Sequence, residues 1–235
     1  MLYNFDCVSS TNDVALDDKY HHGDVICSER QSAGRGQRGN NWSSGSGLNL
    51  TFSVVVEPES LHIREQFSLL RVAALSLVTT LAQYGIDSKI KWTNDIYVGD
   101  KKICGLLIEN RIAEGFVRKS IIGIGLNINQ MEFSPELPNP TSMRSESGRE
   151  FSRERVLGSV VDNLMHYLSM DSWEDLALPY HRSLYRLGEF HRYRTAQGEE
   201  FAAKIVDVAP MGEITLELED GSQQRYIFGE VNFVI

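Results

Sequence analysis

The strongest constraint on the fold is one long amphipathic segment that lies between apolar, β-branched runs. In residues 64–84 apolar side chains recur at about 3.6-residue spacing and the pattern stops at Gly85, which predicts a helix that ends there. Strand-like segments flank this helix at 48–56, 88–92, 101–109 and 116–128. Strands of this kind pair with one another and bury one face under helices, so we predict an α+β fold with a mixed central β-sheet backed by helices.

The first residues predict a strand followed by a helix. Residues 3–8 have a short strand pattern, and Ser10, Thr11 and Asn12 supply capping side chains for a helix that runs towards Tyr20. We expect this helix to lie close to the central sheet.

A second helical region follows an irregular connection. Residues 133–150 contain three prolines and many polar residues, so we expect an exposed segment without regular structure. An apolar stripe then predicts a helix over 152–170. The sequence Ser-Trp-Glu-Asp from Ser172 is typical of a helix start, and Pro179 predicts a kink in that second helix.

The C-terminal part changes to an alternating pattern. From residue 192 to 235, apolar and polar residues alternate between glycine-containing turns, which predicts four or five short strands in a small β-barrel. We therefore expect a catalytic domain over residues 1–187 and a β domain over residues 188–235.

Composition excludes several classes of partner. The chain has 235 residues and a formal net charge of -9, which opposes broad attachment to nucleic acid or anionic membranes. Its three cysteines are far apart and lack the spacing of a zinc site, and no apolar run is long enough to span a membrane. We therefore expect a soluble cytoplasmic protein without a signal peptide.

A glycine-rich loop is the first candidate site. Gly34, Gly36 and Gly39 have the spacing of a dinucleotide-binding fingerprint, but a strand follows them where that fingerprint needs a helix. Arg35 and Arg38 lie between glycines that let the backbone approach an anion, and guanidinium groups match phosphate geometry. The loop indicates a phosphate clamp, although a flexible hairpin with solvated arginines fits the loop alone equally well.

Two further segments contain candidate polar residues. Asn94 and Asp95 lie between apparent strands, where a carboxylate can hold Mg²⁺ or accept a proton, and Lys102 follows in the next strand. In the strand that contains Gly123, glycines interrupt apolar residues and Asn127 follows, an arrangement that allows close approach of a ligand. Each segment by itself fits an ordinary hairpin or a glycine needed for packing.

Together with Ser10, Thr11 and Asn12, these three segments resemble, in this order, the motifs of biotin protein ligases. The resemblance covers essentially the whole chain. It implies an ATP-dependent enzyme that activates biotin as biotinyl-5'-AMP and transfers it to a lysine of a biotin carboxyl carrier protein domain of a biotin-dependent carboxylase. It further implies a class II synthetase-like catalytic domain, an SH3-like barrel, and the monofunctional type without an N-terminal DNA-binding domain.

The resemblance also implies roles for individual residues. The residues implied to bind biotin are Ser10, Thr11, Asn12, Gln31, Gly105 and Leu107. Those implied to bind ATP or the adenylate are Gly34, Arg35, Gly36, Arg38, Trp42, Asn94, Lys102 and Asn127. The implied catalytic residues are Lys102, Arg35, Arg38 and Asp95, with Asp95 as a Mg²⁺ ligand or a partner of the incoming lysine. Closure of the glycine-rich loop is expected to protect the adenylate from water.

Two positions depart from the family pattern. Gln37 replaces an arginine that is common in the loop, so we expect a clamp with one cation fewer that retains its intermediate less tightly. Thr93 replaces a common proline.

Lipoate or octanoate ligases are the nearest alternative function. A non-catalytic biotin-responsive regulator and a degenerate binding module are two further alternatives. The sequence leaves open whether the protein is a monomer or a homodimer.

Overall fold

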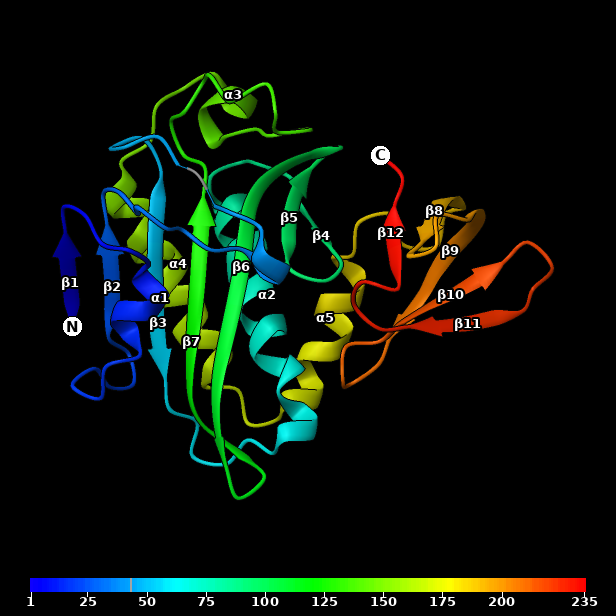
Figure 1. Ribbon diagram of the computed structural model, residues 1–235, viewed down its shortest axis with the longest axis horizontal. Helices are drawn as coiled ribbons and strands as arrows, with labels where there is room; N and C mark the ends of the chain where they lie inside the picture. Colours follow the sequence, from blue (N-terminus) through cyan, green and yellow to red (C-terminus); the bar gives the residue numbers. More distant parts are fainter. Residues whose placement is uncertain (43) are drawn as a thin grey trace.

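Two β-sheets organise the chain (Figure 1). The computed structural model describes residues 1–42 and 44–235, and of Arg38 it describes the backbone alone. The first sheet has seven strands in the order β1-β2-β3-β7-β6-β5-β4. These strands are β1 (Leu2–Phe5), β2 (Val25–Ser28), β3 (Leu50–Val56), β4 (Lys89–Lys91), β5 (Asp95–Val98), β6 (Lys101–Ala113) and β7 (Phe116–Leu126). Since β1 and β2 are parallel and the other neighbours are antiparallel, the predicted mixed sheet is confirmed.

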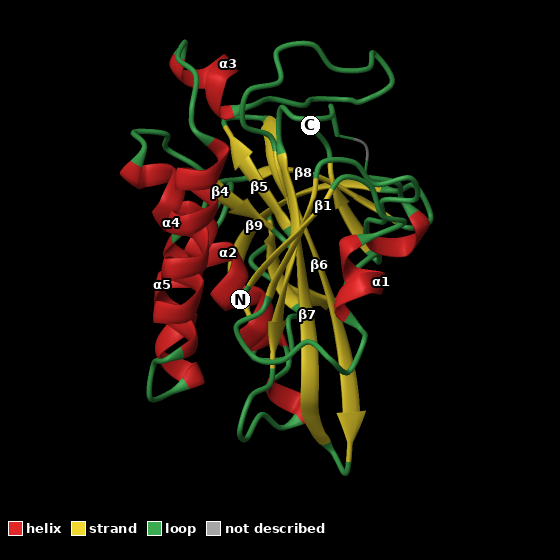
Figure 2. Cartoon of the chain, turned by 90° about the vertical axis from the view of Figure 1, so that its left-hand side faces the viewer, coloured by secondary structure: helices red, strands yellow, loops and turns green. Residues whose placement is uncertain are grey.

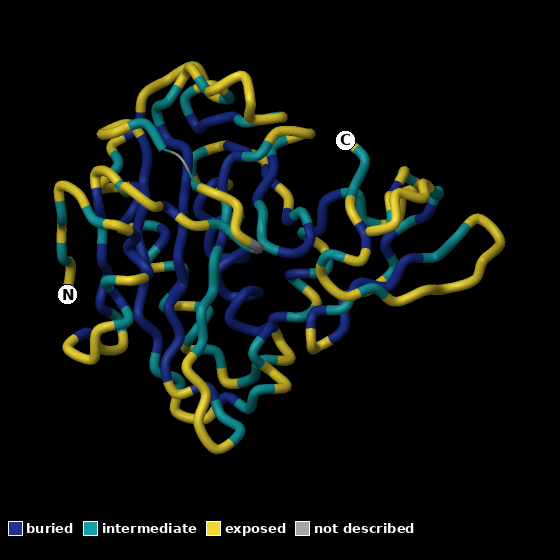
Figure 3. Tube along the Cα trace, in the orientation of Figure 1, coloured by how far each residue is buried: buried dark blue, intermediate teal, exposed yellow. Residues whose placement is uncertain are grey.

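Helices cover one face of this sheet and leave most of the other face for the loops. Figure 2 shows α2 (Phe67–Gln83), α4 (Arg153–Leu168) and α5 (Ala177–Arg182) on one side, and the short α1 (Thr11–Ala15) on the other. The predicted helix end is confirmed, because Gly85 has a φ of +80° just after α2. In Figure 3 the central strands are buried, whereas the tip of the β6–β7 hairpin is exposed. None of the described helices is long and apolar enough to cross a membrane.

Three local predictions need correction. Helix α1 ends at Ala15 and does not continue towards Tyr20. The connection expected to be irregular contains α3 (Met143–Ser147), which Ser142 caps by accepting a hydrogen bond from the Ser145 amide. Pro179 does not kink a longer helix, because it lies near the start of α5, where a missing N–H costs little. The remaining short helices are η1 (Gln37–Gly39), η2 (Ile63–Glu65) and η3 (Trp173–Leu176).

The C-terminal segment forms a second, antiparallel sheet of five strands in the order β11-β10-β9-β8-β12. They are β8 (His191–Thr195), β9 (Glu200–Val208), β10 (Ile214–Leu218), β11 (Gln223–Tyr226) and β12 (Val231–Phe233). Glycines with positive φ occupy the three predicted turns, at Gly198, Gly212 and Gly221. In the described residues β11 and β12 remain the two edges of this sheet, so the predicted barrel is not closed.

Polar anchors fix the second sheet against the first part of the chain. The buried Arg71 of α2 donates to the carbonyl oxygens of Val208 and Ala209, each at 3.2 Å. The indole nitrogen of Trp92 donates to the carbonyl oxygen of Gly212 at 2.8 Å. Because Trp92 directly follows β4, these bonds hold the C-terminal sheet beside that edge of the seven-stranded sheet.

Candidate active site

Glycines form the floor of a cavity on the open face of the seven-stranded sheet. Gly105 of β6 lies opposite Gly125 of β7, and Gly123 lies two residues earlier on the same strand. Side chains two residues apart on a strand point to the same face, so all three positions leave this face bare. Gly105 and Gly125 belong to a row of directly paired residues that runs across the strands. On one side of this row Asp95 of β5 pairs with Gly105, and on the other side Thr51 of β3 pairs with Gly125. The glycine pattern in the sequence thus marks the cavity floor.

The indole of Trp42 lies directly on this floor. A Cβ atom added at Gly125 would overlap the indole ring, and one added at Gly105 would lie 3.2 Å from Trp42 Cζ3. The Trp42 indole nitrogen is buried and has no hydrogen-bond acceptor among the described residues. The Trp42 indole therefore packs on the cavity floor with its N–H available for an acceptor, and its closure over an adenylate stays a prediction.

Polar side chains gather at the end of the cavity next to α1. The amide and the hydroxyl of Thr11 lie 2.7 and 3.1 Å from Gln31 Oε1. Asn12 Nδ2 donates to Glu109 Oε2 at 2.7 Å, and Ser53 Oγ lies 2.6 Å from Asn12 Oδ1. Ser10, Thr11 and Asn12 are each 3% exposed. The structure thus brings together the four polar residues that the sequence assigned to biotin, with Leu107 beside them in the cavity lining.

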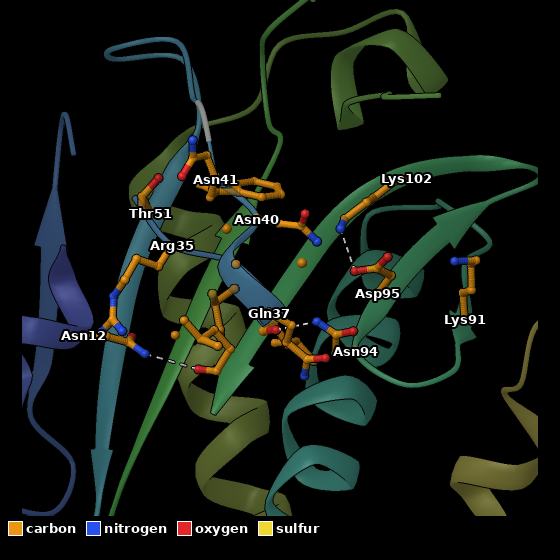
Figure 4. A pocket seen from close by; sticks show the side chains of 18 of the residues that line it. Asn12, Arg35, Gln37, Asn40, Asn41, Thr51, Lys91, Asn94, Asp95 and Lys102 are labelled. Carbon is orange, nitrogen blue, oxygen red and sulfur yellow. Dashed lines mark hydrogen bonds and ion pairs between the residues drawn. The ribbon is translucent and has the colours of Figure 1, made fainter. Parts of the chain in front are cut away.

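The opposite end of the cavity is charged. Lys102 Nζ lies 2.6 Å from Asp95 Oδ1, and both side chains are largely buried (Figure 4). Lys91 also lines the cavity, and its ammonium lies over the rings of Tyr97 and Phe233. Burial lowers the pKa of Lys91 below its ordinary value, and the Asp95 carboxylate opposes this shift only in part. The two lysines and one carboxylate form a mainly cationic end, suited to an anionic ligand.

Arg35 is held by two carboxylates in this structure. One of its guanidinium nitrogens lies 2.6 Å from Asp13 Oδ1 and 3.0 Å from Glu109 Oε2, and its other terminal nitrogen donates to Glu109 at 3.1 Å. The Arg38 side chain, the second arginine assigned to the clamp, lies outside the described part of the structure. Arg35 thus lines the cavity with its guanidinium paired to carboxylates, and its contact with a phosphate stays a prediction.

Three residues assigned to the adenylate take supporting positions. Asn94 lines the cavity, but its Nδ2 donates to the Leu106 carbonyl at 2.7 Å. Asn127 is 5% exposed and donates to the Thr141 carbonyl at 2.9 Å. It is not among the residues that line the cavity, so its adenine contact stays a prediction. The carbonyl oxygen of Gly34 accepts a hydrogen bond from the Trp42 amide at 3.0 Å, whereas Gly36 lines the cavity.

Sequence reasoning missed several residues of the cavity. Lys91 and the C-terminal Phe228, Asn232 and Phe233 line it, and Glu109 links Asn12 to Arg35. Glu109 follows Gly105 and Leu107 at a two-residue spacing, so the strand period alone could have placed it on this face. The contribution of the C-terminal sheet depends on contacts between distant segments, which no local pattern indicates.

The described residues offer no preformed metal cage. In the described ranges 1–42 and 44–235, no three His, Cys, Asp or Glu side chains are grouped so that they could hold an ion. Mg²⁺ is commonly held by one or two carboxylates together with substrate phosphates and water. Asp95 is the carboxylate of the cavity lining, and this donor set fits Mg²⁺ that arrives with a nucleotide.

Comparisons with known proteins agree with this geometry. Residues 4–127 match the model of the biotin/lipoate A/B protein ligase family. The chain is 30% identical to the bifunctional ligase/repressor BirA of Bacillus spizizenii over 238 residues, which cover 94% of this chain and 70% of the relative. It is 24% identical to the biotin--[acetyl-CoA-carboxylase] ligase of Mycobacterium tuberculosis over 83% of this chain and 74% of the relative.

A solved structure shares nearly the whole architecture. The biotin protein ligase of Aquifex aeolicus in complex with biotin and ATP superposes with a TM-score of 0.81 at 26% identity and covers 99% of both chains. The glycine floor, the polar end and the charged end thus lie on a shared fold. The chain belongs to the biotin/lipoate A/B protein ligase family.

Proposed function

We propose that the protein is an ATP-dependent biotin protein ligase. It activates biotin as biotinyl-5'-AMP and transfers the biotinyl group to a lysine of a biotin carboxyl carrier protein domain. The observation that carries this proposal is a single cavity with buried polar side chains at one end and Lys102 with Asp95 at the other. Relatives named as biotin ligases, and the Aquifex complex with biotin and ATP, support it.

The polar end favours biotin over lipoate. The ureido ring of biotin has two N–H donors and one carbonyl acceptor, and Thr11, Asn12 and Gln31 supply matching acceptors and donors. The dithiolane ring of lipoate offers no such groups and would form no hydrogen bonds with these side chains. We therefore assign the cavity to biotin.

Adenylation brings two anions together. A carboxylate oxygen of biotin attacks the α-phosphorus of ATP, and cations must offset the repulsion between them. Lys102 lies at the charged end, and Arg35 can exchange its carboxylate partners for phosphate oxygens. Each preorganised charge of this kind often stabilises the transition state by about 3 kcal/mol. Asp95 would hold Mg²⁺ together with the phosphates of ATP, and the ion would supply further positive charge there.

Transfer requires an uncharged amine. The ε-amine of the carrier lysine attacks the carbonyl carbon of the anhydride, the bond to the AMP oxygen breaks, and AMP leaves. Asp95 lines the cavity beside Gly105 and has one oxygen within 2.6 Å of Lys102 Nζ. We assign it to orient the incoming amine and accept its proton.

The C-terminal sheet is assigned to the SH3-like type. Strands β8 to β11 form an antiparallel meander, and β12 returns to pair with β8, as in a small barrel that is partly open. Its last strand reaches the cavity through Asn232 and Phe233. We assign this sheet to contact the carrier domain, because its last strand borders the cavity.

The test is biotin-dependent exchange of labelled pyrophosphate into ATP with Mg²⁺. We expect exchange with biotin, loss of about a hundredfold in Lys102→Ala, and no exchange with lipoate or octanoate. Lys101→Ala is the matched control, because the neighbouring Lys101 is 60% exposed and pairs with Glu146 outside the cavity. Exchange with lipoate alone would move the assignment to the sister activity, and no exchange with any acid would refute a ligase.

A further inference from the structure

Lys91 differs from the other described cations that line the cavity. Arg35 is paired with Asp13 and Glu109, and Lys102 is paired with Asp95. Lys91 has no ion pair with any residue that the structure describes. Its Nζ instead lies 5.1 Å from the ring centre of Tyr97 and 5.2 Å from that of Phe233. Aromatic faces attract an ammonium without using its N–H groups, so the donors of Lys91 stay free for a ligand.

The strand register places Lys91 at the end of the cavity row. Lys91 of β4 lies opposite Asp95 of β5, and Asp95 lies opposite Gly105 of β6. Residues directly opposite in antiparallel strands have side chains on the same face, so the ammonium lies on the face of the glycine floor. Figure 4 shows Lys91 beyond Asp95 and Lys102 when viewed from Asn12.

This order along the cavity decides which part of the ligand Lys91 meets. The biotin ring occupies the end at Asn12, and the carboxylate meets the α-phosphate near Lys102. A group beyond that point belongs to the remainder of ATP, which is either the neutral nucleoside or the β,γ-diphosphate. An unpaired ammonium complements the diphosphate and offers a nucleoside no comparable attraction.

We propose that Lys91 binds the β- and γ-phosphates of ATP and stabilises the pyrophosphate that leaves during adenylation. This inference rests on the proposed function. The carboxylate oxygen of biotin forms a bond to the α-phosphorus, and the bond from that phosphorus to the α,β-bridging oxygen breaks. The electron pair remains on pyrophosphate, so negative charge grows next to the ammonium. Phe233 contributes from the C-terminal sheet by holding Lys91 in place.

The test separates the two half-reactions. Lys91→Met keeps an apolar stem between the two rings but removes the charge, and Lys91→Arg restores a charge. Lys89→Met is the matched control, because Lys89 is an exposed lysine on the same strand and does not line the cavity. For each variant we would measure adenylation with ATP, the reverse reaction of biotinyl-5'-AMP with pyrophosphate, and transfer from preformed biotinyl-5'-AMP to a carrier domain.

For Lys91→Met we expect the rates of adenylation and of the reverse reaction to fall about a hundredfold. The rate of the reverse reaction should also depend less strongly on pyrophosphate concentration. Transfer from preformed adenylate should stay within about twofold of wild type, and Lys91→Arg should recover part of the loss. Equal loss in all three reactions, loss of transfer alone, or unchanged adenylation would each overturn the proposal. A wild-type protein without biotin-dependent exchange would instead refute the proposed function.

Discussion

Arg35 provides the sharpest test of how the cavity controls its charge. Its guanidinium is 42% exposed and pairs with Asp13 at 2.6 Å and with Glu109 at 3.0 Å. To bind a phosphate it must give up these carboxylates, which compete with ATP. Among the described residues Asp13 forms an ion pair with Arg35, whereas Glu109 pairs with Arg35 and also accepts a hydrogen bond from Asn12. Asp13→Asn therefore weakens the hold on Arg35 without disturbing Asn12.

The size of the effect follows from exposure. An exposed ion pair of this kind is worth about 0.5–1 kcal/mol, which corresponds to about two- to fivefold in an equilibrium constant. We therefore expect Asp13→Asn to bind ATP two- to fivefold more tightly on this estimate. A second effect opposes stability, because Asp13 lies in the first turn of α1, where a negative charge contributes about 0.3–1 kcal/mol. That loss is too small to unfold a domain of this size.

The assay is calorimetric titration of ATP into biotin-saturated protein, at low and high salt. Asp17→Asn is the control, since it removes the same charge from an exposed carboxylate that pairs with Lys19. The gain in Asp13→Asn should exceed that of the control at low salt and fade at high salt, because exposed charges are screened. ATP affinity that is unchanged or weaker than in the control would show that Arg35 keeps its carboxylates when ATP binds, and would refute the reasoning.

Three further predictions follow from individual side chains. Gly123→Ala would place a Cβ 3.0 Å from Asn12 Cγ and displace that amide, so titration should show biotin binding at least tenfold weaker, on an estimate of about 1.4 kcal/mol or more for a disrupted buried bond. Because Asn12 also bonds Ser53 and Glu109, denaturant unfolding should show a loss of stability of about 1–3 kcal/mol. Gly158→Ala in α4 has open space around the new methyl group, so denaturant unfolding should show a gain of about 0.5–1 kcal/mol with wild-type exchange activity. Burial raises the pKa of Cys27 to about 12, which keeps its thiol protonated and unreactive at about pH 8, so mass spectrometry after iodoacetamide should find the exposed Cys7 labelled and Cys27 labelled only after unfolding.

Elements with a strong local period could be predicted from the sequence. Helix α2 and its end at Gly85 follow from the apolar stripe, and the long strands β6 and β7 follow from their branched residues. Strand β2 could not be predicted in this way, because its four residues, Val-Ile-Cys-Ser, are too short to show a period. The short helix α3 was missed because the polar segment around it resembles a loop, and only the cap at Ser142 distinguishes it.

The candidate site could be predicted in part, because some of its residues also leave a local pattern in the sequence. Glycines inside strands indicated the floor, because glycine there leaves room for another group, and Gly105, Gly123 and Gly125 all face the cavity. The pairing of Lys91 with Asp95 depends on the register of two strands, and its contact with Phe233 joins segments far apart in the chain. Periodicity within one segment carries no information on either.

The pairing of charges explains how an acidic chain with a net charge of -9 maintains a cationic cavity. Without ligand, Arg35 and Lys102 are neutralised by carboxylates, which limits repulsion between neighbouring cations. The Arg35 pairs are exposed enough to be exchanged for a phosphate at little net cost, whereas the largely buried pair of Lys102 and Asp95 keeps both side chains in place. Lys91 has no ion-pair partner among the described residues, and its ammonium lies over two aromatic rings instead. Lys91 thus adds an unpaired positive charge to the cavity lining at the end where the diphosphate of ATP is proposed to bind, so neutralising Lys91 should lower the salt dependence of ATP binding.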